Sequence, residues 1–126
     1  MNISLEGIIL FVKDVPMLKA FYMQNMGLQL IEETDDGGWA LLGAGQCTLG
    51  LHKIGLGYTA AENPAPVCES NTKMVFEVGE DVVALRDKLL QAGVLMREIK
   101  TFPNYGYWIC DGEDPEGNVF QLRQPK

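Results

Sequence analysis

The sequence predicts an α+β fold made of two βαβββ modules. The chain has 126 residues, of which 47% are hydrophobic and 21% charged, so it can bury the core of one globular domain. Apolar residues alternate with period two in several short runs and recur every three or four residues in two longer ones. These periods predict short strands and two amphipathic helices, and the order strand, helix and three strands occurs twice.

The first module is expected over residues 1–54. Residues 3–12 are rich in β-branched residues and predict a strand. Asp14 is the expected N-cap of a helix that has Pro16 in its first turn and ends at Gly27. The remaining strands of this module are expected at 28–31, 39–42 and 47–54, with turns at 35–38 and 43–45.

The second module is expected over residues 72–126, after a linker at 55–71 whose glycines and prolines show no periodicity. A strand at 73–78 precedes a helix that is opened by Glu80 or Asp81 and closed by Gly93. The elements repeat those of the first module at an offset of 66 or 67 residues, which indicates a pseudo-twofold arrangement of two facing sheets. The apolar stripe of the helix is Val82, Leu85, Leu89 and Ala92, and the later strands are expected at 94–100, 105–110 and 118–123.

Three stretches carry a family resemblance, and together they cover nearly the whole chain. They are LFVKDVPMLKAFYMQNMGLQL (10–30), FEVGEDVVALRDKLLQAGV (76–94) and DPEGNVFQL (114–122). With these motifs the chain resembles the vicinal oxygen chelate superfamily, which holds glyoxalase I, extradiol dioxygenases, fosfomycin-resistance enzymes and bleomycin-resistance proteins. The resemblance implies a cup-shaped mixed sheet with helices on its outer face, a site inside the cup, and a homodimer. The DPEGN segment itself is interpreted as a structural turn.

The metal positions of the family are occupied here by unsuitable residues. Metal-dependent members take one ligand from the first and one from the fourth strand of each module. The resemblance places these positions on Gly7, Gly50, Lys73 and Gln121. Glycine has no side chain and a protonated lysine has no lone pair, so we expect no metal and no cofactor. The alternative is a displaced ligand set of His52, Glu77 and Gln121 on the same strand faces.

Strand alternation places a mixture of apolar and polar side chains on the cup side, which is typical of a small-molecule pocket. The aromatic candidates either line the cup or fill the core. Lys73 either binds an anionic substrate or acts as a base, or it pairs with Glu77 or reaches solvent. The candidate ligand-binding residues are Ile9, Trp39, His52, Lys73, Glu77, Tyr105, Tyr107 and Gln121.

Charge and composition narrow the class of partner. The net charge of −7 disfavours nucleic acid and anionic membranes and favours a cationic small molecule. The three cysteines form no CxxC pair and the N-terminus has no secretory pattern, so we expect a cytoplasmic protein with free thiols. The sequence thus favours a metal-free, bleomycin-resistance-like binding protein for a small organic molecule. The alternatives are a glyoxalase-like lyase, isomerase or dioxygenase, using the displaced ligands or Lys73, Glu77 or His52 as acid or base, and an interaction module.

Overall fold

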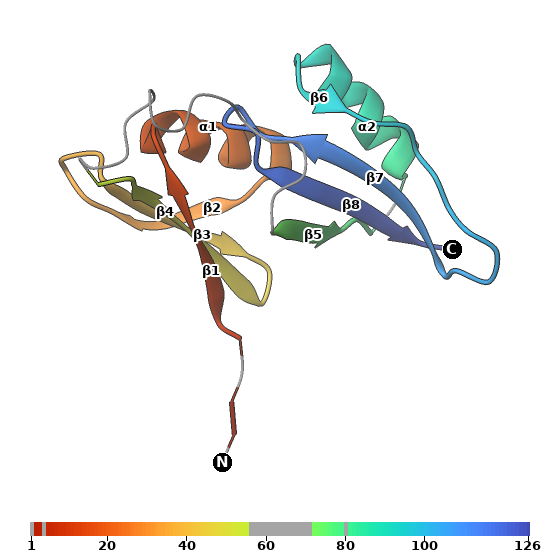
Figure 1. Cartoon of the computed structure of the whole chain (residues 1–126), viewed down its shortest axis with the longest axis horizontal. Helices are drawn as coiled ribbons and strands as arrows, with labels where there is room; N and C mark the ends of the chain where they lie inside the picture. Colours follow the sequence, from red (N-terminus) through yellow and green to blue (C-terminus); the bar gives the residue numbers. More distant parts are fainter. Residues whose placement is uncertain (1, 4, 56–71, 80) are drawn as a thin grey trace. The chain divides into compact units, whose positions relative to one another are not determined.

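The computed structural model describes residues 2–3, 5–55, 72–79 and 81–126 (Figure 1). The chain divides into two compact units, residues 1–64 and 65–126. Apart from Gly55, the predicted linker lies outside the described residues, as does Glu80. None of the helices in the described ranges is long and apolar enough to cross a membrane.

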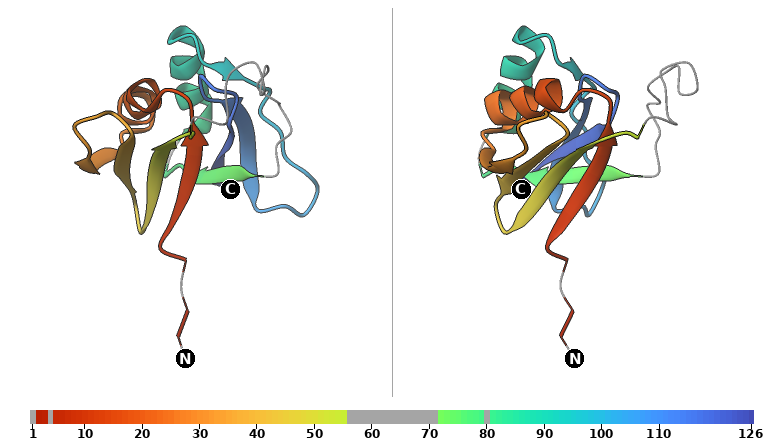
Figure 2. Two further views of the ribbon diagram at one scale, coloured as in Figure 1. Left: turned by 60° about the vertical axis from the view of Figure 1, so that its left-hand side comes forward. Right: turned by 90° about the vertical axis from the view of Figure 1, so that its left-hand side faces the viewer.

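The first unit is one four-stranded sheet with a helix on one face (Figure 2). Its strand order is β1-β4-β3-β2, in which β1 and β4 are parallel and the other neighbours are antiparallel. The elements are β1 (Gly7–Val12), α1 (Val15–Met26), β2 (Gln29–Glu33), β3 (Trp39–Ala44) and β4 (Cys47–Lys53).

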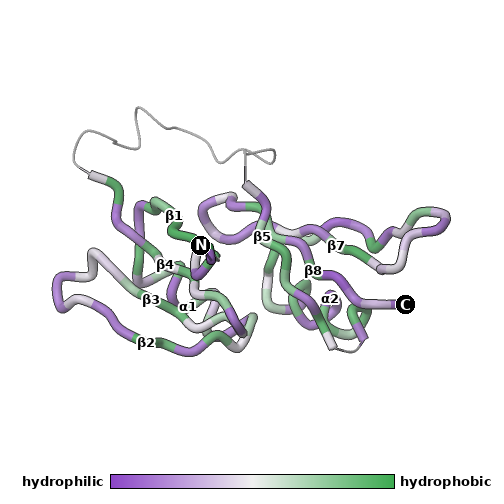
Figure 3. The backbone as a smooth tube through the Cα atoms, turned by 90° about the horizontal axis from the view of Figure 1, so that it is seen from below, coloured by the Kyte–Doolittle hydropathy of each residue, from purple (hydrophilic) through white to green (hydrophobic). Residues whose placement is uncertain are grey.

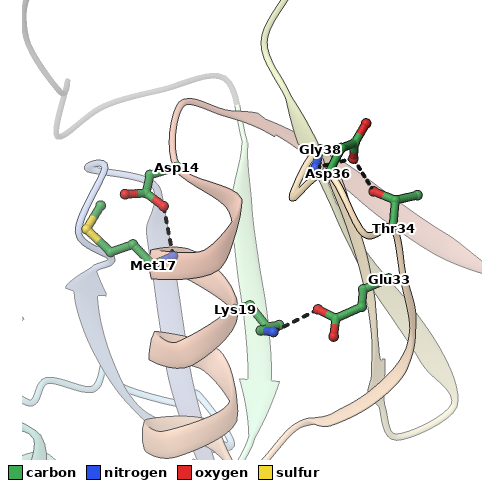
Figure 4. Close-up of polar contacts among 7 residues, drawn as sticks. All are labelled: Asp14, Met17, Lys19, Glu33, Thr34, Asp36 and Gly38. Atoms are coloured by element: carbon green, nitrogen blue, oxygen red, sulfur yellow. Dashed lines mark hydrogen bonds and ion pairs between the residues drawn. The ribbon is translucent and has the colours of Figure 1, made fainter.

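Helix α1 begins and ends where the sequence predicts. The Oδ1 of Asp14 accepts a hydrogen bond from the backbone N–H of Met17 at 3.0 Å (Figure 4), and a proline occupies the first turn. Gly27 closes the helix with φ at 68°, a left-handed conformation that favours glycine. Val15, Leu18 and other apolar residues of α1 are buried, and the helix packs on β3 and β4.

Polar contacts fix the far end of β2 and the turn that follows it (Figure 4). The ammonium of Lys19 on α1 lies 2.7 Å from a carboxylate oxygen of Glu33. The Oδ1 of Asp36 accepts hydrogen bonds from Thr34 Oγ1 at 2.7 Å and from the Gly38 backbone N–H at 2.9 Å. These two hydrogen bonds lower the pKa of Asp36, so the predicted turn is stabilised by an ionised carboxylate.

The second unit repeats the first. Its strand order is β5-β8-β7-β6, again with one parallel pair, β5 and β8, and the helix is capped by Asp81, whose Oδ1 accepts from the Ala84 N–H at 3.0 Å. The order confirms the predicted α+β fold of two βαβββ modules. The elements are β5 (Lys73–Glu77), α2 (Val82–Gln91), β6 (Leu95–Met96), β7 (Tyr107–Glu113) and β8 (Val119–Pro125).

The strand predicted at 94–100 was too long. It is reduced to β6 and an isolated bridge between Lys100 and Ile109. The Arg97 N–H donates to the Asp111 carbonyl, and the Lys100 N–H donates to the Ile109 carbonyl. The two donors are three residues apart along the chain, whereas their two acceptors are only two residues apart. The extra residue interrupts the ladder, as a β-bulge does.

Other predicted boundaries also move. The first strand begins at Gly7 and not at residue 3, Gly43 lies inside β3 and not in a turn, and Tyr105 precedes β7. In α2, Ala92 is the exposed C-cap and does not belong to the buried stripe. These ends depend on partner strands and on the sheet beneath, which the local pattern does not specify.

The core of each unit lies between its helix and one face of its sheet. The buried strand residues on these faces are apolar, and Figure 3 shows β1 as hydrophobic over nearly its whole length. Buried examples are Leu10, Val12, Leu49 and Leu51 in the first unit, and Met74, Phe120 and Leu122 in the second.

The DPEGN segment is a turn, as predicted. The Oδ1 of the buried Asp114 accepts hydrogen bonds from the backbone N–H groups of Glu116 and Asn118, both at 2.9 Å. Gly117 has φ at 81°, which favours glycine at this position. The motif joins β7 to β8 and fixes their register.

Candidate functional site

The open face of the first sheet, opposite α1, brings three predicted site residues into one neighbourhood. In the register of β1, β4 and β3, Ile9 pairs with Gly50, and His52 lies between Phe11 and Trp39. Ile9 and Phe11 are 54% and 69% exposed, in contrast to the buried residues of the other face. The alternation predicted from the sequence therefore describes this face correctly.

Phe11, Trp39 and His52 form an aromatic cluster on this face. The ring of His52 meets that of Phe11 edge-on at a centroid distance of 5.3 Å, and that of Trp39 edge-on at 6.1 Å. A Cβ atom on Gly50 would lie 2.6 Å from Trp39 Cη2 and 3.0 Å from Ile9 Cγ1. The glycine is therefore what allows the indole to lie across the strand.

The open face of the second sheet carries four further predicted residues. In the register of β5, β8 and β7, Lys73, Glu77, Gln121 and Tyr107 fall on the same face. Tyr105 precedes β7, but its ring lies 5.6 Å from that of Tyr107, so it joins this group through ring packing.

A carboxylate that sequence reasoning missed holds two of these residues. The ammonium of Lys73 lies 2.8 Å from Oδ2 of Asp111, and the amide nitrogen of Gln121 donates to Oδ1 of Asp111 at 3.0 Å. We call these three residues the Asp111 cluster. The side chain of Asp111 is 8% exposed and that of Lys73 is 45% exposed.

The Asp111 cluster keeps its carboxylate ionised. Burial alone would raise the pKa of Asp111, but the hydrogen bonds from Lys73 and Gln121, together with the charge of Lys73, outweigh it and lower the pKa. The ammonium of Lys73 carries three N–H donors, and its exposure leaves room for a ligand to accept from it.

Lys73 does not pair with Glu77, which was one interpretation of the sequence. Glu77 instead lies 3.2 Å from a guanidinium nitrogen of Arg123. The same guanidinium lies over the ring of Tyr107, 4.4 Å from its centroid. The charged side chains of the second face are therefore paired with one another.

Strand alternation could have identified Asp111. Tyr107, Ile109 and Asp111 share one face, but the predicted strand ended at Cys110 and so stopped one residue short. The continuation to Glu113 arises from pairing with β8, which the local sequence does not encode.

The residues at the four metal positions do not fit a divalent cation. Gly7 and Gly50 supply no ligand atom, and the indole of Trp39 covers Gly50. Lys73 and Gln121 both donate to Asp111. Of the displaced set, Glu77 pairs with Arg123. Over residues 2–3, 5–55, 72–79 and 81–126, no three His, Cys, Asp or Glu side chains group as metal ligands do.

The duplicated βαβββ unit, with its helix on one side and an open sheet face on the other, defines a vicinal oxygen chelate fold. The chain belongs to the Glyoxalase/Bleomycin resistance protein/Dioxygenase superfamily, whose family model matches residues 4–122. No curated protein matches the sequence.

Solved structures share the fold at low sequence identity. The antibiotic binding protein TnmS3 from Streptomyces sp. CB03234 is 23% identical, with a TM-score of 0.75 over 100% of this chain and 99% of that one. The fosfomycin resistance protein FosX from Listeria monocytogenes is 14% identical, with a TM-score of 0.76 over 100% and 96%. Lactoylglutathione lyase from Agrobacterium tumefaciens is 18% identical, with a TM-score of 0.74 over 98% and 95%. At these low sequence identities, the similarity shows a shared fold and says nothing about the ligand.

Proposed function

We propose that this chain binds a small organic molecule without a metal ion, using the open faces of its two sheets. The observation that carries the proposal is the chemistry of the metal positions, where two glycines stand on one sheet and the Asp111 cluster on the other. We further propose, from the family resemblance, that these faces line one cup and that the protein is a homodimer.

Each of the two faces suits a different part of the ligand. Exposed Ile9 and Phe11, with the rings of Trp39 and His52, suit an apolar or aromatic surface. Trp39 and Phe11 also suit a cationic group, in keeping with the net charge of −7. The exposed ammonium of Lys73 suits a polar acceptor on the ligand. Two proteins of similar fold, the antibiotic binding protein TnmS3 and the fosfomycin resistance protein FosX, have functions of the same general kind.

Native mass spectrometry of the protein, purified without added metal or chelator, tests the proposal. We expect a metal-free dimer, either bare or carrying an organic mass. The melting temperature should rise with ligands from a panel of cationic aromatic compounds and stay unchanged with Mn²⁺ or Zn²⁺. One metal ion per chain, together with stabilisation by that ion, would contradict the proposal.

The enzymatic alternatives gain no support from these contacts. Two of the three predicted acid or base groups, Lys73 and Glu77, each lie in an ion pair with another residue, and the third, His52, lies beside two aromatic rings. A glyoxalase-like lyase, isomerase or dioxygenase of the displaced-ligand type would lose its activity to a chelator, which gives the same experiment a second readout.

A further inference from the structure

His52 is held in one tautomer by its own strand. Its Nδ1 lies 2.8 Å from the backbone carbonyl oxygen of Lys53. A carbonyl oxygen only accepts hydrogen bonds, so Nδ1 must carry the proton and donate it. A neutral imidazole carries one ring proton, and Nε2 is therefore left with a lone pair.

The imidazole of His52 lies beside two aromatic rings on the open face of the first sheet. The rings of Phe11 and Trp39 flank the imidazole edge-on, and the imidazole is itself exposed. Within the described part of the chain, no hydrogen bond to Nε2 is present. The other polar side chains of β1, β3 and β4 on this face are those of Thr48 and Trp39. The Thr48 hydroxyl already donates to the Glu6 carbonyl, and the Trp39 indole has a donor but no acceptor.

From this geometry we infer that Nε2 of His52 accepts a hydrogen bond from the ligand, which is an aromatic molecule carrying an N–H or O–H donor. The inference rests on the proposed function and names the ligand class of its first face. Apolar rings flanking one acceptor select for a planar molecule and fix its orientation by a single polar contact. A ligand without the donor would desolvate Nε2 and leave it unpaired.

The test uses indole and 1-methylindole, in which a methyl group replaces the hydrogen of the N–H donor. His52 is the only histidine in the chain, so the ¹⁵N imidazole signals of the labelled protein report on it alone. At about pH 7.5, where an ordinary imidazole is neutral, we expect the Nδ1–H tautomer in the free protein. Indole should shift the Nε2 signal and bind about tenfold more tightly than 1-methylindole. In His52→Phe, which keeps a ring and removes the acceptor, the two probes should bind equally.

The outcomes separate this inference from the proposed function. Equal binding of both probes to the natural protein, with an unmoved Nε2 signal, would overturn the inference and leave the binding proposal standing. An Nε2–H tautomer in the free protein would overturn the inference by itself. Binding of neither probe would overturn the inference, whereas the binding proposal would still be decided by the panel of cationic aromatic compounds. Because His52 is exposed, we expect His52→Phe to fold, and an unchanged melting curve is the control.

Discussion

The open faces of the two sheets differ sharply, although the units that carry them share one strand order. The first face is apolar and aromatic, with exposed Ile9 and Phe11 beside Trp39. The second carries charged side chains beside apolar ones such as the exposed Val75, and its charges are paired as Lys73 with Asp111, Glu77 with Arg123 and Arg97 with Glu113. The buried strand residues of the helix-covered faces, by contrast, are apolar in both units.

The difference follows from what each face must do. A helix-covered face has to fill a core, and only apolar side chains do so at low cost. An open face is free of that requirement, so its residues can vary while the fold is kept. The two repeated units therefore share one fold but carry different open faces. The first face suits an apolar surface, and the second suits a polar group.

Removing Asp111 should have the largest effect on stability. Asp111→Ala leaves the donors of Lys73 and Gln121 without their shared acceptor, and we expect the free energy of unfolding to fall by about 2 kcal/mol. Urea denaturation measures the loss. The matched control is Glu77→Ala on the same face, whose side chain is 53% exposed and which should cost less than about 1 kcal/mol. Equal losses would show that the Asp111 cluster is no stronger than a surface pair.

On the first face, Gly50→Ala should cost about 1–2 kcal/mol, because its Cβ would lie 2.6 Å from Trp39 Cη2 and must displace the indole. The tryptophan fluorescence spectrum, to which both Trp39 and Trp108 contribute, should shift with it. Gly43→Ala is the control on the same sheet, since the nearest atom to its Cβ would be Ile31 Cδ1 at 3.6 Å, an ordinary contact. A tolerated Gly50→Ala would mean that the indole does not lie as described.

Acid should act on the second unit through Asp111. Its pKa is lowered in the folded chain, so its ionised form adds stability above the unfolded value of about 4. That stability is lost as the pH falls through the lower folded value. Unfolding free energies measured against pH should therefore converge for the natural protein and Asp111→Asn in acid. Asp36, whose pKa is also lowered, acts equally in both proteins and cancels in the comparison.

The sequence predicts local features of this fold well and non-local ones poorly. The caps of α1 at Asp14 and Gly27 follow from residue type and spacing alone, and the structure confirms both. Asp111 was missed because the length of β7 is set by its pairing with β8. One predicted partner of Lys73 was Glu77 on its own strand, whereas the actual partner, Asp111, lies on a different strand of the sheet. Alternation along a strand predicts which face of the sheet a residue lies on. Predicting which residue it contacts also requires the register between neighbouring strands.

The smallest effect on stability should come from Phe11→Ala. This side chain is 69% exposed, so its removal should change the free energy of unfolding by less than about 0.5 kcal/mol. If the first face holds the aromatic part of a ligand, the same change should weaken the binding of indole several-fold, because it removes the apolar surface beside His52. Phe102→Ala is the control in the second unit, where a ring of 50% exposure packs on Tyr105, and indole binding should not change. A Phe11→Ala variant that loses stability but keeps its affinity would show that the aromatic cluster serves the fold and not a ligand, and the contrast between the two faces would then be structural.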